Sequence, residues 1–407
     1  MRAIARAVHL TSMADLKRVW SKRLIVAAAI LAVLCVTNVV LTAGGGAQAQ
    51  AQQEKPKTAG ETFKNVTTST LKGLTVDDFI GAMGVMAAGL GFDCADCHRG
   101  AGYDTVDWAA DTMPTKVKAR KMVEMVATIN RENFAGVQVV TCWTCHHGRD
   151  IPGTSIALDR LYDSPNDESD DIIARDPDAP APNVIFDRYI AALGGAERLS
   201  RLTSFIATGT QNGGYQRVEG GGIFQIFARF PDQRTVHITF PKAPERGEQT
   251  RAYDGRVGWI NTPRSVLGEY EVTGTELDGQ RFEAQLAFPA QIKQILSNPR
   301  TGFDESIQGH PVQVVQGTGP RGLLVTLYFD KGTGLLRRML RFGKSPVGRI
   351  STQVDYDDYR AVDGIKFPFK VVFSWLDGRD GFDITDVKTN VPIDPAVFGR
   401  PRQATKR

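Results

Sequence analysis

Two five-residue motifs in this chain combine thiol and imidazole side chains at a spacing that could bind haem covalently. They read Cys94-Ala-Asp-Cys97-His98 and Cys142-Trp-Thr-Cys145-His146, and they start 48 residues apart. C-x-x-C-H is the attachment signature of c-type haem, in which two thiols form thioethers with the porphyrin and the next imidazole ligates the iron. We therefore predict two haem c groups, attached through the four cysteines and ligated by the two histidines.

The same cysteines could instead form redox-active dithiols or, taken together, a zinc site. Both alternatives leave the histidine that follows each cysteine pair without a role. The chain has five cysteines, and the fifth, Cys35, lies in an apolar N-terminal run. We interpret Cys35 as an apolar membrane residue, so the haem hypothesis uses every other cysteine.

A sixth iron ligand is expected from the helix that precedes each motif. Thr75 and Asp78 form a capping-box-like start to one helix, which carries Met83 and Met86 and ends at glycines 89 and 91. A second helix, over 114–130, carries a methionine pair at the same i, i+3 spacing, Met122 and Met125. Thioether sulfur is a common ligand of c-type haem iron. We expect one methionine per iron, and spacing alone does not choose within each pair.

The N-terminal segment has the composition of an export signal. Residues 1–50 contain six Lys or Arg against one Asp, with an apolar run over 24–43 and an A-x-A cleavage pattern at Ala47-Gln48-Ala49. The run is also long enough to cross a bilayer. We predict a signal peptide or membrane anchor over 1–51 and a periplasmic location, in agreement with c-type haem attachment outside the cytoplasmic membrane.

Net charge and length restrict the class of binding partner and the number of folded units. The formal charge is +4, and the N-terminal 50 residues supply +5, so the other 357 residues carry −1. This net charge does not indicate a positively charged surface of the kind that binds nucleic acid. A length of 407 residues favours two or three folded units.

Composition shifts divide the chain into segments. We predict a small, mainly α dihaem cytochrome c domain and a large antiparallel β domain, a curved sheet or half-barrel with helices. The expected boundaries are a linker over 52–64, the dihaem domain over 65–153, an acidic proline-containing linker over 154–182, the β domain over 183–401 and a tail over 402–407.

The β domain is indicated by short alternating runs separated by turn signals. Helices are expected over 185–202 and 280–296. The expected strands are 204–208, 222–229, 234–240, 256–261, 312–315, 323–329, 335–341, 351–356, 367–375 and 382–387. This domain has no recognisable catalytic motif and no cysteine, and His237 and His310 stand alone in the sequence.

The haem region resembles the cytochrome subunit of photosynthetic reaction centres. The matching text spans 71–152 and includes Met83 eleven residues before Cys94, Lys118-Ala-Arg-Lys-Met122 and the stretch Val140-Thr-Cys-Trp-Thr-Cys-His-His-Gly148. The resemblance implies Met83 and Met122 as the sixth ligands, with Met86 and Met125 as packing neighbours. Members typically carry four haems and an Arg where this chain has His147. A role in reducing a photo-oxidised pigment is therefore not carried over.

The segment 183–401 resembles bacterial lipoprotein-carrier domains through short motifs. They are Tyr359-Arg-Ala-Val-Asp-Gly-Ile-Lys-Phe-Pro368 and Asn390-Val-Pro-Ile-Asp-Pro-Ala-Val-Phe398. The resemblance implies a curved antiparallel sheet with an apolar concave face that could hold an acyl chain or a quinone-like ligand.

These features together predict a periplasmic dihaem cytochrome that passes electrons between redox proteins and is not an enzyme. Two alternatives stay open. One is a dihaem peroxidase-like enzyme or haem sensor with an open iron position. The other is an envelope protein that binds lipid or lipoprotein and is tethered to a cytochrome unit.

Overall fold

The computed structural model of this chain describes residues 55–103, 106–153, 172–213, 221–263 and 266–401. The chain divides into two compact units, Met1–Lys55 and Pro56–Arg407, and every element below belongs to the second unit. The predicted signal or anchor and the first part of the acidic linker lie outside the described residues. Within the described ranges, no helix combines the length and apolar character that a membrane crossing requires.

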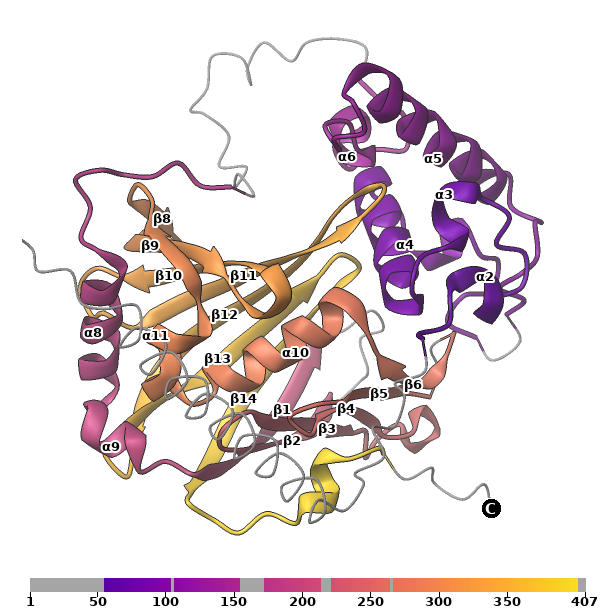
Figure 1. Ribbon diagram of the computed structural model, residues 1–407. Coiled ribbons are helices and arrows are strands. Elements are labelled where there is room, and N and C mark those ends of the chain that lie inside the picture. The colour runs from indigo at the N-terminus through magenta and orange to yellow at the C-terminus, as the bar shows by residue number, and fades with distance from the viewer. Residues whose placement is uncertain (1–54, 104–105, 154–171, 214–220, 264–265, 402–407) are drawn as a thin grey trace, which may run out of the picture. The chain divides into compact units, whose positions relative to one another are not determined.

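The haem region is built from short and medium helices (Figure 1). They are α2 (Ala59–Thr62), α3 (Ser69–Lys72), α4 (Val76–Leu90), the 3₁₀ turn η1 (Cys94–Asp96), α5 (Pro114–Asn133) and α6 (Cys142–His146). Helix α4 starts as expected, because the Thr75 hydroxyl accepts from Asp78 N. It ends at Gly91, whose φ of 67° is the left-handed conformation that glycine adopts readily.

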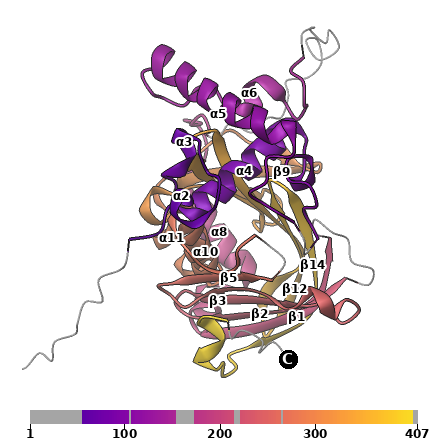
Figure 2. The same cartoon turned by 90° about the vertical axis from the view of Figure 1, so that its right-hand side faces the viewer.

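The rest of the unit is a single antiparallel sheet, as predicted. Its strands are β1 (Ser204–Gly213), β2 (Gly222–Arg229), β3 (Gln233–Thr239), β4 (Gln249–Tyr253), β5 (Gly258–Thr262), β6 (Gly268–Val272), β7 (Ser297–Thr301), β8 (Glu305–Ile307), β9 (His310–Thr318), β10 (Leu324–Asp330), β11 (Leu336–Ser345), β12 (Gly348–Val362), β13 (Ile365–Trp375) and β14 (Gly378–Thr389). Their order is β6-β5-β4-β3-β2-β1-β14-β13-β12-β11-β10-β9-β7, and β8 pairs with β9. Figure 2 shows the sheet bending between β12–β14 and β2–β5.

Four helices accompany the sheet: α8 (Pro182–Leu193), α9 (Ala196–Ser200), α10 (Gly274–Leu286) and α11 (Ile292–Ile295). They contribute Phe186, Leu193, Phe282 and Ile292 to the main apolar core. Each of the two helices expected here is broken in the structure. Gly194 and Gly195, with φ of 129° and 92°, separate α8 from α9, and Pro289 opens a 3₁₀ turn between α10 and α11.

Several strands differ from the expectation. Strands β4, β6, β7 and β8 were not predicted, although the range 256–261 anticipates β5. The observed β12 and β14 are also longer than their predicted ranges, because polar residues continue both strands past the apolar alternation. Sequence patterning therefore finds the central strands and misses most of those near the sheet edges.

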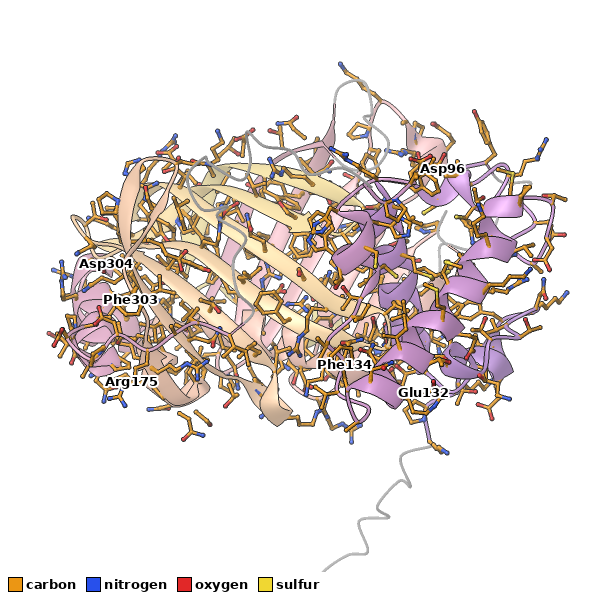
Figure 3. The ribbon with its side chains drawn as sticks, turned by 90° about the horizontal axis from the view of Figure 1, so that it is seen from above. Asp96, Glu132, Phe134, Arg175, Phe303 and Asp304 are labelled. Carbon is orange, nitrogen blue, oxygen red and sulfur yellow. The ribbon has the colours of Figure 1, made fainter. Side chains whose placement is uncertain are left out.

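The described end of the acidic linker lies against the sheet. Arg175 forms an antiparallel bridge with Gly302, and Asp176 N donates to Thr301 O at 3.1 Å. Figure 3 shows Arg175 beside Phe303 and Asp304. Backbone pairing thus holds this segment close to strand β7.

Helix α4 packs directly on the sheet. Phe79 and Val85 of α4 share an apolar cluster with Val347 and Ile350. The close approach depends on Gly81, because a Cβ there would lie 2.3 Å from the Ile350 Cδ1 atom. The haem region and the sheet therefore share buried surface.

Candidate haem-binding site

The first motif follows α4 through a tight turn. After Gly91, the Asp93 side chain accepts from Ala95 N at 2.7 Å and caps η1. His98 N then donates to Cys94 O at 2.8 Å. These local bonds turn the backbone so that Cys94, Cys97 and His98 follow within one compact loop.

All the predicted residues of the first site line one cavity. The cavity has a volume of about 920 Å³, and its wall includes Met83, Cys94, Cys97 and His98. That size lies within the range of pockets that bury a cofactor-sized ligand. Met86 also lines the cavity, so the structure does not choose between the two methionines of α4.

The imidazole of the first motif is partly buried and lies near a positive charge. Burial, followed by the nearby Lys116 ammonium, lowers the pKa of His98 below its ordinary value. Lys116 is itself fixed, because its Nζ donates to the carbonyls of Trp108 and Ala110. The Trp108 ring lies 5.2 Å from the His98 ring, centroid to centroid. A neutral imidazole is the form that ligates iron.

The second motif is positioned by the end of α5. Asn130 is buried, and its amide oxygen accepts from the backbone N–H groups of Val139 and Val140, while its Nδ2 donates to Val140 O at 2.7 Å. Thr141 then caps α6 by accepting from Thr144 N. Asn130 therefore clamps the loop that leads into the motif.

The orientation of His146 suits iron ligation. Its Nδ1 lies 2.8 Å from Arg149 O, a backbone acceptor, so Nδ1 carries a proton and Nε2 is the nitrogen left to face a metal. A backbone carbonyl that holds the second ring nitrogen is typical of metal-ligating histidines. His147 is exposed, adopts φ of 48° and packs edge-on against Trp143.

Several large apolar side chains are exposed on α5, in the second motif and in the loops that flank the motif. Met122 is 37% exposed, Met125 43% and Trp143 44%. Further exposed apolar residues in the same region are Val117, Phe134, Val137, Val139 and Ile151. Figure 3 shows Phe134 beside Glu132 near the surface of this region. An apolar group such as porphyrin would cover such a surface, so these residues fit a haem.

The end of α4 contacts the second motif through glycines. Gly148 N donates to Gly89 O at 2.9 Å. A Cβ on Gly91 would lie 2.4 Å from Gly148 O, and one on Gly89 would lie 3.0 Å from the Cys142 Cβ. Only glycine permits this close approach, which holds the end of the helix that precedes the first motif against the second motif.

The thiols do not have the properties of redox dithiols. Burial raises the pKa values of Cys94 and Cys97, and it raises the pKa of Cys142 to about 11. Reactive thiols have lowered pKa values. The four motif cysteines form no disulfide. In the part of the chain that the structure describes, no cluster of three or more His, Cys, Asp or Glu side chains is arranged to hold a metal ion.

Sequence reasoning missed some supporting contacts. No motif or spacing in the sequence predicts that Trp108 lies beside His98. The two histidines of the sheet also have partners, contrary to their isolated appearance: His237 lies 3.2 Å from Glu248, and His310 lies 3.6 Å from Asp330. Both are paired with nearby carboxylates.

Comparison with known proteins confirms the resemblance of the haem region. Residues 37–173 match the family described as Photosynthetic reaction centre cytochrome C subunit. The chain is 35% identical over 98 residues to the photosynthetic reaction center cytochrome c subunit of Thermochromatium tepidum, covering 23% of this chain and 22% of that protein. For the same subunit of Roseobacter denitrificans the values are 36% over 102 residues, 23% and 26%. The chain thus spans about a quarter of these relatives.

Among solved structures, the chain is similar to two other bacterial proteins. A LolA superfamily protein from Nitrosomonas europaea matches at 18% identity with a TM-score of 0.38, covering 55% of this chain and 99% of that one. A DUF1329 family protein from Desulfovibrio piger matches at 10% identity with a TM-score of 0.38, covering 54% and 98%.

Proposed function

We propose that this chain is an exported c-type cytochrome that carries two covalently attached haems and passes electrons between redox proteins in the periplasm. The observation that carries the proposal is the glycine contact between the second C-x-x-C-H motif and the end of α4, the helix that leads into the first motif. A methionine-bearing helix precedes each motif. The similarity of the same stretch to reaction-centre cytochrome c subunits supports covalent haem.

The axial pairs in this proposal are His98 with Met83 and His146 with Met122. A haem held by these residues would supply a one-electron ferric/ferrous couple. The chain supplies two imidazoles, one held by Arg149 O, and polarisable thioethers. Two protein ligands per iron leave no position for a substrate. Electron transfer is therefore favoured over peroxidase-like chemistry.

The two sites differ in their surroundings. The first lies in a cavity whose wall includes sheet residues such as Phe373 and Trp375. The second motif carries the exposed Trp143, and its proposed methionine ligand, Met122, is exposed on α5. We assign the second site as the one that exchanges electrons with a protein partner, because a redox centre near the surface shortens the path to that partner.

Haem stoichiometry tests the proposal. The intact mass of the exported protein is expected to exceed the polypeptide mass by two haem groups. Replacing Cys94 and Cys97 with Ala should remove one haem, and replacing Cys142 and Cys145 should remove the other. Cys35→Ala serves as the matched control and should leave both in place. A polypeptide mass without haem, under conditions where another c-type cytochrome is matured, would refute the proposal.

A further inference from the structure

A second cavity lies under the curved sheet and shares a wall with the first. Its volume is about 350 Å³. The residues that line both cavities come from strands β4, β5, β13 and β14: Gln249, Arg251, Ile260, Thr262, Phe373 and Asp380. The space beneath the sheet therefore adjoins the first haem cavity at these side chains.

The two ends of this space differ chemically. Away from the shared wall, at the inner end, the lining is mostly apolar, with side chains such as Phe205, Ile226, Val236 and Phe367, and it also includes the ion pair Arg234–Glu283. The shared wall is polar, since Gln249, Arg251 and Asp380 belong to it. This arrangement suits an amphipathic molecule with a long apolar tail in the inner end and a polar head at the shared wall.

Arg251 belongs to a largely buried charge network with an excess of one positive charge. It pairs with Glu276, which also accepts from Arg341 at 3.0 Å. Glu283 completes the network, 3.1 Å from Arg341 and 3.6 Å from Arg234. Three arginines face two glutamates. Arg251 also lies 5.4 Å from the Phe373 ring, so its positive charge is directed at the shared wall.

Two carboxylates, one buried and one partly buried, also line the first cavity. Asp77 is 8% exposed, and its Oδ2 accepts from Thr273 N and from Thr273 Oγ1 at 2.8 Å. Its Oδ1 has no hydrogen-bond partner among the described residues. Asp380, which faces both cavities, accepts from Gln211 at 2.7 Å. Burial raises the pKa values of both groups, which favours proton uptake.

We propose that the space beneath the sheet binds an isoprenoid quinol, with its tail in the apolar cavity and its head at the shared wall, and that the quinol is the electron donor to the first haem. The inference rests on the proposed function, because it needs two haems as acceptors. The apolar run at 24–43 would bring the chain to a membrane, where such quinols are found.

The electrons and protons of the proposed reaction are all accounted for. One quinol gives up two electrons and two protons and becomes a quinone, while two ferric haems become ferrous. Both O–H bonds of the quinol break. Asp77 and Asp380 are the carboxylates placed to accept the protons, and Arg251 is placed to bind a head-group oxygen. A fatty acid or phospholipid would use the same apolar cavity but would have no use for two proton acceptors beside a redox centre.

Binding is measured first, by calorimetry on the exported protein with oxidised decylubiquinone, and with palmitate in a parallel titration. We expect one quinone per chain. Ile226→Trp fills the cavity and should weaken binding at least tenfold. Ile223→Trp is the matched control, since Ile223 lies three residues away on the exposed face of β2 and should bind as wild type. Arg251→Gln should weaken binding several-fold, and Arg256→Gln, at an exposed turn, should not.

Electron transfer is measured next, by mixing the reduced quinol with the ferric protein under anaerobic conditions. We expect one quinol to reduce two haems, and Ile226→Trp to slow this at least tenfold. Palmitate binding without quinone binding, no binding of either, or haem reduction unaffected by Ile226→Trp would each overturn the inference. The variant with Cys94 and Cys97 changed to Ala should still bind quinone, so a failure of haem attachment is distinguished from a failure of this site.

Discussion

Individual polar groups in the haem region fix the metal-binding side chains before any metal is considered. Arg149 O holds the ring of His146, and burial lowers the pKa of His98. The methionines are less constrained. Met83 and Met86 line the same cavity, and Met122 and Met125 are both exposed on one face of α5. The choice within each pair therefore needs a direct test.

We predict that Met83→Leu and Met122→Leu each remove one of the two methionine–iron charge-transfer bands of the ferric protein. Loss of thioether also lowers the reduction potential of the haem concerned, because thioether favours ferrous iron. Met86→Leu and Met125→Leu are the matched controls and should retain both bands. A band lost on changing Met86 or Met125 would reassign that ligand.

Asp77 makes stability depend on pH. Burial raises its pKa from 3.8 to about 6, so the folded state binds the proton more tightly than the unfolded state. The stabilisation is complete below about pH 4 and is lost as pH rises through about 6, with a total on the order of 3 kcal/mol.

Denaturant unfolding at a series of pH values tests this expectation. Asp77→Asn should flatten the slope between about pH 4 and pH 6, because the amide oxygen can still accept from Thr273 and carries no charge. Glu132→Gln, at an exposed position on α5, should keep the wild-type slope. An unchanged slope in Asp77→Asn would place the titrating group elsewhere.

At the scale of elements, the ends of α4 and α6 are joined by glycines, and the loop into α6 is clamped by Asn130. Neither contact can be predicted from the spacing of apolar residues in the sequence. The first depends on left-handed backbone at Gly91 and close approach at Gly89. The second depends on a buried amide with three backbone partners.

Gly91→Ala is expected to lower the free energy of unfolding by about 2–4 kcal/mol, because alanine is strained at φ of 67° and its Cβ would meet Gly148 O. Gly73→Ala is the control, since Gly73 has φ of −88° and no atom within 4 Å of an added Cβ. It should change stability by less than about 0.5 kcal/mol. Equal effects in the two variants would argue against the glycine contact.

Asn130→Ala removes three hydrogen bonds and should cost about 2–3 kcal/mol. Haem attachment at the second motif should fall more than at the first, as measured by mass spectrometry of peptides. Asn133→Ala, one turn on, loses only a bond to Ile129 O within the same helix and should behave as wild type. Equal loss at both motifs would mean that Asn130 acts on the whole region.

Much of this architecture was accessible from the sequence. The start of α4 follows from Thr75 and Asp78, and the central strands follow from their alternation. The edge strands were harder, since β4 places Thr250 and Arg251 where an apolar residue would signal a strand. Gly194 and Pro289 are residue types that commonly interrupt helices. The helical spacing of the apolar residues around them nevertheless predicted two unbroken helices. Trp108 contacts His98, and the shared wall brings together strands that are distant in the sequence. A local sequence pattern cannot predict contacts of this kind.

At the scale of the molecule, a cytochrome-like region and a curved sheet share buried surface. Val347 and Ile350 pack against α4, Cys142 N donates to Val347 O at 3.2 Å, and Thr273 bonds to Asp77. The second motif and α4 are thus both attached to the sheet. We infer that the sheet domain and the electron carrier act as one unit rather than as a carrier with a passive tether.

The most direct test of the central claim is the visible spectrum of the purified exported protein, oxidised and reduced, with and without carbon monoxide. We predict two low-spin haems per chain, a methionine–iron charge-transfer band in the ferric state and no spectral shift with carbon monoxide. A high-spin component, or a ferrous haem that binds carbon monoxide, would contradict the account by showing an iron with an open position.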